Sequence, residues 1–256
     1  MAYERVLVFG DIHACYAKFS ALLAKVKPDP TRDFIIFLGD YVDRGEDVTA
    51  TLDYIMDLKA KSNQVVTLMG NHEWMMDLFF GNLDGKVKEP TQHKDSWMYG
   101  QNGGQGTYSA LKKREAKEPG YMAKVFEFVA SLPYTYEMDI GGRVYFFTHG
   151  GVDPSRPLNE QKEMDLVWHR EEFYDRLPAG AFEGRTFVVG HTPVQYLKYF
   201  VLDNGGDEGL AASLRDDPKP VHLPQRDNII FMDTGSYLTG GRISCRDFLS
   251  GQLWQA

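Results

Sequence analysis

The chain has 256 residues, a net charge of −8 at pH 7 and two cysteines, and 43% of its residues are hydrophobic. This size and apolar fraction are sufficient for a buried core, whereas the negative charge gives no general attraction to nucleic acid or to an anionic membrane. Two cysteines exclude a disulfide framework and no apolar stretch approaches the length of a membrane span, so we expect a cytoplasmic protein without membrane or nucleic-acid partners.

The first third of the chain alternates short apolar runs with helical patterns, which is typical of βαβ units around a largely parallel sheet. A Gly and a polar residue follow each predicted strand, as Gly10-Asp11, Gly39-Asp40 and Gly70-Asn71. Open α/β sheets bind ligands at the carboxyl ends of their strands, so these three turns predict a site. The predicted strands are residues 6–9, 34–38 and 65–69, and the predicted helices are residues 16–26, 48–59 and 74–80.

The middle of the chain begins with a polar segment, residues 82–106, for which we predict a long loop over the site. Helical patterns follow over residues 107–117 and 122–131. Residues 135–138 and 143–147 then predict a β-hairpin.

The last part of the chain contains a second series of apolar runs. It predicts a sheet that is joined by loops more than by βαβ units. Residues 204–228, rich in Asp, Gly and Pro, predict a surface excursion. The fold class is therefore α/β, with two mixed β-sheets packed as a sandwich and flanked by helices. The second-half strands are predicted at residues 144–147, 187–189, 198–202, 229–232 and 243–249.

Polar residues also follow two predicted strands of the second half, where "VYFFTHGG" carries His149 and "TFVVGHTP" carries His191. Carboxylate, amide and imidazole donors without thiolate suit Mn²⁺, Fe²⁺ or Zn²⁺. Six donors are more than one tetrahedral ion binds, so two ions that share one carboxylate account for them best. Two ions about 3.5–4 Å apart can bind the attacking and the leaving oxygen of a phosphoryl group. The six strand-end residues are Asp11, His13, Asp40, Asn71, His149 and His191.

Each of these residues alone has another reading. A Gly-Asp pair after a strand is usually a turn, a strand-end His is more often hydrogen-bonded than metal-bound, and Asn71 alone predicts a helix N-cap. His72-Glu73 begins like the zinc-protease pattern H-E-x-x-H, but Met76 at the fifth position excludes it. Five strand ends that finish alike favour a shared metal site.

In order and spacing, "GDIHACY", "GDYVDRGE", "GNHE", "HGG" and "GHT" resemble the motifs of calcineurin-like metallophosphoesterases of the PPP Ser/Thr phosphatase type. The resemblance spans residues 10–240, and "VWHRE" and "MDTGSYLTGG" are similar to the compact bacterial and bacteriophage lambda phosphatases. It implies the calcineurin-like fold in one domain over residues 1–256. It also implies two divalent metal ions, with Mn²⁺ as the first choice and Fe or Zn as alternatives.

The resemblance assigns the metal ligands residue by residue. One ion would be held by Asp11, His13 and Asp40. The other would be held by Asp40, Asn71, His149 and His191, so that Asp40 bridges the two. One motif departs from the family: "GDIHACY" has Ala14 where Gly is usual, and a positive φ there would shift His13 slightly.

The resemblance also implies catalytic roles. His72 would be the general acid that protonates the leaving oxygen, and Asp43 would hydrogen-bond it. Arg44 and Arg170 would bind the phosphate, although an ion pair with its acidic neighbour is the alternative for Arg170. We expect Glu73 to support the helix start electrostatically. The mechanistic hypothesis is in-line attack by a hydroxide that bridges the two ions, without a phosphoenzyme.

The favoured substrate is a phosphoserine or phosphothreonine protein or peptide. A second reading is symmetrical bis(5'-nucleosyl)-tetraphosphatase or related nucleotide hydrolysis, a branch that tends to read GDLVARG and GNHD where this chain has "GDYVDRG" and "GNHE". In that reading Trp97 and Tyr99 of the covering loop would stack on a base. A third reading, a non-catalytic scaffold of the same fold, ranks last because no ligand and no acid is missing.

Overall fold

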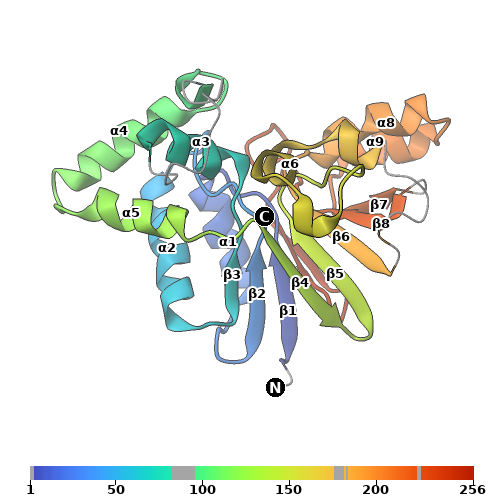
Figure 1. Cartoon of the computed structure of the whole chain (residues 1–256), viewed down its shortest axis with the longest axis horizontal. Coiled ribbons are helices and arrows are strands. Elements are labelled where there is room, and N and C mark those ends of the chain that lie inside the picture. The colour runs from blue at the N-terminus through green and yellow to red at the C-terminus, as the bar shows by residue number, and fades with distance from the viewer. Residues whose placement is uncertain (1–2, 82–95, 176–181, 183, 224–225) are drawn as a thin grey trace.

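The computed structural model describes residues 3–81, 96–175, 182, 184–223 and 226–256, and all statements about absences below concern these residues. Two five-stranded sheets pack face to face, and helices cover the outer face of each (Figure 1). This is the predicted α/β class of two packed mixed sheets flanked by helices. Within the described ranges, no helix has both the length and the apolar character needed to cross a bilayer.

The first sheet has the order β10-β9-β1-β2-β3. Its strands β1, β2 and β3 run parallel, as predicted, while β9 is antiparallel to β1 and β10 is antiparallel to β9. The predicted strand 243–249 was expected in the sheet of the second half, which is wrong, because the chain returns after β8 and pairs β9 with β1. Helices α1 and α2 follow β1 and β2, and α3 follows β3 (Figure 1). The bounds are β1 Arg5–Phe9, α1 Tyr16–Val26, β2 Asp33–Phe37, α2 Val48–Lys61, β3 Val65–Thr67, α3 Asn71–Phe80, β9 Ser244–Asp247 and β10 Leu253–Gln255.

The second sheet has the order β4-β5-β6-β8-β7. Strands β4 and β5 form the predicted antiparallel hairpin. Strands β5, β6 and β8 run parallel with helices between them, so the expectation of a sheet joined mainly by loops is wrong. The bounds are β4 Thr135–Ile140, β5 Arg143–Thr148, α6 Glu163–Trp168, α7 Glu171–Tyr174, β6 Arg185–Val189, α8 Leu197–Asp203, α9 Glu208–Asp216, β7 Val221–Leu223 and β8 Arg226–Phe231.

Three segments differ from their predicted structure. Residues 198–202, predicted as a strand, belong to helix α8. The predicted excursion 204–228 contains α9, β7 and the start of β8. The predicted loop 82–106 contains the 3-10 helix η1 (Ser96–Met98) and the first turn of α4 (Gly104–Glu115), while residues 82–95 lie outside the described part; α5 (Tyr121–Ala130) follows close to its predicted position.

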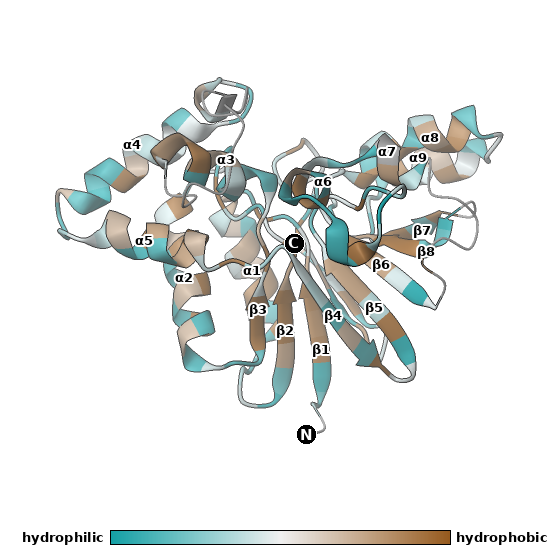
Figure 2. Ribbon diagram, viewed as in Figure 1, coloured by the Kyte–Doolittle hydropathy of each residue, from teal (hydrophilic) through white to brown (hydrophobic). Residues whose placement is uncertain are grey.

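Alternation along the strands explains how one sheet has two buried faces. In β1, Val6 and Val8 face the second sheet, where they pack with Phe147 and Val188. Leu7 and Phe9 point the other way, into the core beneath α1 and α2. This is the period-2 pattern of a strand covered on both sides, and most of β1 and β2 is accordingly hydrophobic, with hydrophilic residues at their N-terminal ends (Figure 2). Because the two sheets pack together, the loops that follow their strands meet at a common edge.

Candidate active site

The loops that follow the strands are bonded to one another at the carboxyl edge of the two sheets. His13 N, after β1, donates to the carbonyl oxygen of Asp40, after β2, at 2.8 Å. Gly190 N, after β6, donates to the carbonyl oxygen of His149, after β5, at 2.9 Å. His149 Nδ1 lies 2.8 Å from the carbonyl oxygen of Leu38, which joins the second sheet to the first. Hydrogen bonds therefore connect the loops of both sheets along this edge.

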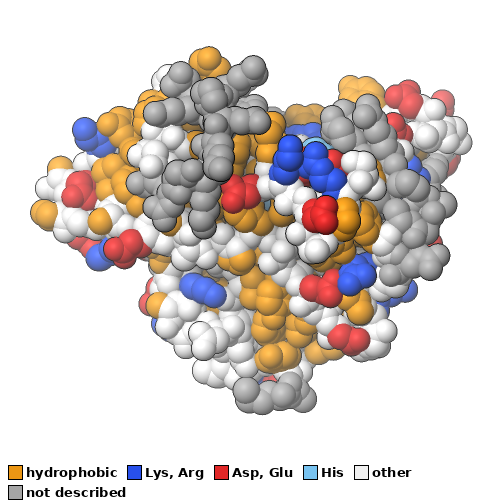
Figure 3. All heavy atoms as spheres, in the orientation of Figure 1, with side chains coloured by type: hydrophobic (Ala, Val, Ile, Leu, Met, Phe, Trp, Pro, Cys, Tyr) orange, Lys and Arg blue, Asp and Glu red, His pale blue; other side chains and the backbone are white. Residues whose placement is uncertain are grey.

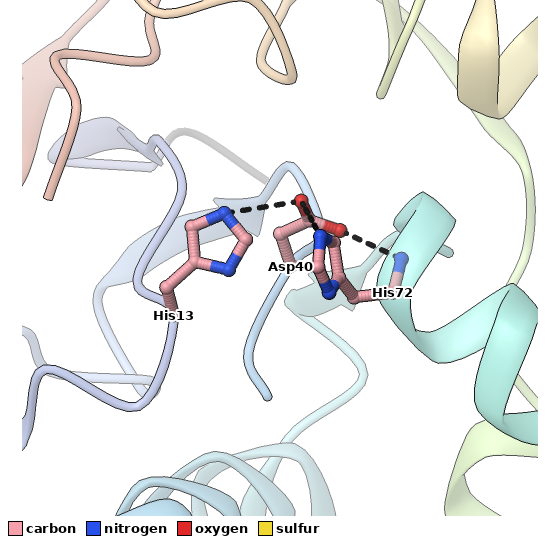
Figure 4. A group of neighbouring side chains, drawn as sticks. All are labelled: His13, Asp40 and His72. Atoms are coloured by element: carbon pink, nitrogen blue, oxygen red, sulfur yellow. Dashed lines mark hydrogen bonds and ion pairs between the residues drawn. The ribbon is translucent and has the colours of Figure 1, made fainter. Parts of the chain in front are cut away.

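Asp40 lies at the centre of this edge, with histidines on both sides of its carboxylate. His13 Nε2 is 3.3 Å from Asp40 Oδ2, and His149 Nε2 is 3.3 Å from Asp40 Oδ1. Figure 4 shows Asp40 between His13 and His72, whose Nε2 is 4.0 Å from Oδ2. Oδ2 therefore faces His13 and His72, and Oδ1 faces His149.

Asn71 occupies the first position of α3, and Gly70, rather than Asn71, is the N-cap. The capping alternative for Asn71 is therefore wrong. Its Oδ1 lies 2.9 Å from His149 Nε2 and 2.7 Å from His191 Nδ1. The amide oxygen thus points at the same two imidazoles that line the far side of Asp40.

Two overlapping groups of buried side chains offer the donor atoms of a metal site. In each group the donor atoms lie within 4.8 Å of one another, and Asp40 belongs to both. Asp11 belongs to neither group, but its Oδ2 accepts from His191 N at 3.0 Å. The first group is His13, Asp40 and His72, and the second is Asp40, His149 and His191.

The chemistry of these donors fits divalent metal ions. Because carbonyl oxygens of Val42 and Leu38 can only accept, they fix the proton of His13 and His149 on Nδ1 and leave Nε2 free as a ligand. His191 Nε2 is buried without a hydrogen-bond partner. Imidazole nitrogens beside carboxylate and amide oxygens are the donor set that Mn²⁺, Fe²⁺ and Zn²⁺ take.

Electrostatics at the site favours the ligand protonation states of His13, His191 and Asp40, but not those of Asp11 and His149. Burial lowers the pKa of His149, but the facing Asp40 outweighs burial and raises this pKa above its usual value. Burial lowers the pKa of His13 and His191 well below the usual range, so both are neutral at pH 7. Burial alone would raise the pKa of Asp40, but the facing histidines, His149 first, hold it well below its usual range. Burial, followed by the neighbouring acidic groups, raises the pKa of Asp11 well above it. A second positive centre near Asp11 would relieve this strain on its charge.

Glu73 does more than support a helix start, which is the role that we expected. Its carboxylate is fully buried and accepts four backbone N–H groups. Oε2 accepts from Asp40 N at 2.8 Å and from Gly70 N at 3.2 Å. Oε1 accepts from Tyr41 N at 2.8 Å and from Val42 N at 3.1 Å. Glu73 therefore holds the loop on which Asp40, with φ of 55°, presents its carboxylate.

His72 points from α3 toward Asp43, and its Nδ1 lies 2.6 Å from Asp43 Oδ2. The carboxylate holds the Nδ1–H tautomer, so His72 Nε2 is directed at the cluster around Asp40.

In the first motif, "GDIHACY", the backbone at Ala14 has the positive φ that we considered for this position. Both His13 and Ala14 have positive φ, 49° and 51°, so the methyl group stands where Gly would be less strained.

The two predicted phosphate-binding arginines flank the cluster. Arg44 Nη1 is 3.0 Å from His13 Nε2, and its guanidinium stacks 4.1 Å from the ring centroid of Tyr237. Arg170 Nη2 lies 3.4 Å from His191 Nδ1 on the other side. Arg44 lines a cavity of about 600 Å³ and Arg170 one of about 490 Å³. Figure 3 shows Lys or Arg side chains beside a His side chain on this face of the molecule.

One buried acid at the site escaped the sequence reasoning. Asp233 follows β8, accepts from Gly235 N at 2.8 Å through Oδ1, and has no hydrogen-bond partner at its buried Oδ2. Burial raises its pKa to about 6, and nearby Asp40 adds to the increase. The signal was present, because "MDTG" repeats the pattern of an apolar strand that ends in an acid.

Comparisons with known proteins identify the family of this chain. The model of the calcineurin-like phosphoesterase family matches residues 4–221. Serine/threonine-protein phosphatase 2 of Salmonella typhimurium is 26% identical over 93% of this chain and 90% of its own length. The symmetrical bis(5'-nucleosyl)-tetraphosphatase of Shewanella baltica is 42% identical, but over 31% of this chain and 26% of its own length.

The fold has counterparts among solved structures. A protein provisionally assigned as a diadenosine tetraphosphatase superimposes with a TM-score of 0.58 over 98% of this chain and 92% of that chain, at 18% identity. At this identity the likeness concerns the fold alone. With a family model that covers most of its length and a fold shared with solved relatives, this chain belongs to the calcineurin-like phosphoesterase family.

Proposed function

We propose that this chain is a dinuclear-metal phosphomonoesterase that acts as a protein-serine/threonine phosphatase. The observation that carries the proposal is the shared position of Asp40, which belongs to two donor groups. Two divalent ions, Mn²⁺ as our first choice, would be held around Asp40 by Asp11, His13, Asn71, His149 and His191, and would supply the positive charge that activates water and neutralises phosphate.

The side chains around the cluster supply the other steps. Arg44 and Arg170, from opposite sides, would bind the phosphate oxygens and stabilise their charge as the bond breaks. A water oxygen attacks phosphorus in line and loses a proton to solvent, while the bond to the leaving oxygen breaks. His72, held by Asp43, gives its Nε2 proton to that oxygen, which keeps the electron pair of the broken bond. The imidazole then regains a proton from solvent.

A phosphoprotein substrate is supported by the relative that matches nearly the whole chain, the Salmonella Ser/Thr phosphatase. The nucleotide alternative is supported by higher but local identity to the symmetrical tetraphosphatase. Trp97 is fully buried and offers no face to a base, which weakens that alternative, whereas Tyr99 is exposed and leaves a ring that could stack on a base. The free, buried state of Cys15 and Cys245 supports the cytoplasmic location that we propose.

The substrate proposal is tested by parallel assays of the purified protein with Mn²⁺. We expect phosphate release from a phosphoserine peptide with a kcat/KM well above that for diadenosine tetraphosphate. Faster cleavage of the dinucleotide into two diphosphates would support the alternative function. Hydrolysis of neither substrate, nor of an aryl phosphate, would favour the scaffold.

The proposed role of His72 is tested by His72→Asn. Loss of the general acid should lower kcat about 10²–10⁴-fold for esters with poor leaving groups and much less for activated aryl esters. Metal content should be unchanged. His222→Asn, on edge strand β7, is the matched control and should behave as wild type. Equal losses for all leaving groups would contradict the role.

A further inference from the structure

Trp97 lies beside the proposed general acid rather than over the substrate. It is the central residue of η1, is fully buried, and packs against Phe79 and Phe80 with ring centroids 5.3 and 5.7 Å away. Its indole Nε1 donates to Asp43 Oδ2 at 2.8 Å. The oxygen that receives His72 Nδ1 at 2.6 Å therefore receives a second donor from Trp97.

Thr107, on α4, holds the other side of the same carboxylate. Its hydroxyl donates to Asp43 Oδ1 at 2.5 Å and accepts from Asp43 N at 3.1 Å. Both residues are buried. The two bonds also hold the unusual backbone at this point, since Asp43 and Arg44 have φ of 71° and 69°. Thr107 thus fixes the main chain and the side chain of Asp43 together.

Close packing ties the two donors to each other and to this loop. A Cβ on Gly104 would lie 2.2 Å from the carbonyl oxygen of Trp97, and a Cβ on Gly103 would lie 2.6 Å from Arg44 N. Gly103, with φ of 85°, also tolerates a conformation that side chains disfavour. The start of α4 is therefore seated directly against η1 and the Asp43–Arg44 turn.

We propose that Trp97 and Thr107 are positioning residues that orient Asp43 and, through it, the imidazole of His72. With three donors on its two oxygens, the Asp43 carboxylate has one favoured orientation. It then holds the proton on His72 Nδ1 and keeps Nε2 aimed at the leaving oxygen. This inference rests on the proposed general-acid function of His72.

Thr107→Val tests the inference with little change of volume. We expect kcat for phenyl phosphate and for a phosphoserine peptide to fall about tenfold or more, a part of the general-acid effect, with KM nearly unchanged. The loss should be small for p-nitrophenyl phosphate, whose leaving group needs little protonation. Thr107→Ser, which restores the hydroxyl, should recover the rate.

A spectroscopic readout separates positioning from folding. The downfield Nδ1–H proton resonance of His72 should shift or broaden in Thr107→Val and return in Thr107→Ser. Thr51→Val is the matched control, because it also removes a buried hydroxyl, one that donates to the carbonyl oxygen of Asp47 at 2.9 Å. That variant should keep the leaving-group dependence of wild type. Trp97→Phe is the second variant and should reproduce the leaving-group effect of Thr107→Val.

The outcomes distinguish the two proposals. If His72→Asn depends on the leaving group but Thr107→Val and Trp97→Phe do not, the positioning role is wrong and the proposed function stands. If the two variants lose activity equally for all esters, together with metal content, their role is structural only and the inference fails. If His72→Asn itself shows no leaving-group dependence, the general-acid role and this inference both fail.

Discussion

Replacement of Glu73 by Gln tests how the loop of Asp40 is held. The carboxylate accepts backbone N–H groups of Asp40, Gly70, Tyr41 and Val42 at 2.8–3.2 Å. The amide of Gln has a single oxygen, so two of these buried N–H groups would face an NH₂ group instead. Each unsatisfied buried donor costs about 1–3 kcal/mol, which gives a loss of about 2–6 kcal/mol in the free energy of unfolding.

Urea unfolding at pH 7, followed by circular dichroism, measures this change, and the m-value should stay constant. Glu115→Gln is the matched control. Glu115 also accepts two backbone N–H groups, from Gly120 at 2.9 Å and Met122 at 2.8 Å, but at the surface, where water replaces the lost acceptor. We expect a much smaller loss there. Burial and the neighbouring Asp40 raise the pKa of Glu73 to about 8, but both oxygens of a neutral carboxyl group still carry lone pairs for the N–H groups, whereas the NH₂ group of Gln only donates. A Glu73→Gln variant that is as stable as wild type would therefore refute the reasoning.

Three further predictions concern the same site. Gly70→Ala should abolish Mn²⁺ binding, because a Cβ would lie 2.3 Å from Asp40 N and from Asp40 Oδ1. Gly100→Ala is the control, since its Cβ meets nothing within 4 Å, and it should bind Mn²⁺ normally in calorimetry. Equal binding by both variants would contradict this prediction. Burial raises the pKa of Asp233 from 3.8 to about 6. The neutral Asp233 therefore contributes to the free energy of unfolding below pH 4, and this contribution of about 3 kcal/mol is lost as the pH rises to about 6. In metal-free protein, Asp233→Asn should therefore match wild type at pH 4 and be more stable at pH 8, and a pH-independent difference in urea unfolding would refute this. Chelation should remove phosphatase activity and lower the unfolding temperature, and added Mn²⁺ should restore both; activity that survives full chelation would exclude a metal role.

Local patterns in the sequence were sufficient for β1, β2 and β3 of the first sheet and the helices that follow them. They did not place β9 in this sheet, and β10 was not predicted. Asp40 and Asn71 follow adjacent parallel strands, so their proximity could be predicted from the strand pattern alone. The placement of His149 and His191 opposite them required the second sheet to face the first. The hydrophobic periodicity of the strands does not predict how the two sheets pack. The expectation that His149 and His191 lie at the site came from the spacing of the motifs.

The helix α8 shows how a short apolar run misleads. Residues 198–202 have a strand-like composition, but the buried residues of this segment are Leu197, Phe200 and Val201. These positions have the i, i+3, i+4 spacing of a helix face, which becomes visible when the window is extended by one residue.

The remaining parts of the site depend on contacts between distant residues. Glu73 bonds to a loop 31–33 positions away, and Trp97 to an acid 54 positions away. Both contacts require backbone conformations with positive φ at Asp40 and Asp43, which side-chain patterns do not predict. Sequence reasoning therefore reached the residues that meet at the site but not those that hold them there.

Anomalous diffraction at the manganese edge, from crystals grown with Mn²⁺, tests the shared position of Asp40 most directly. The account predicts two peaks about 3.5–4 Å apart, each within bonding distance of one carboxylate oxygen of Asp40. A single peak, or two peaks that Asp40 does not join, would contradict it.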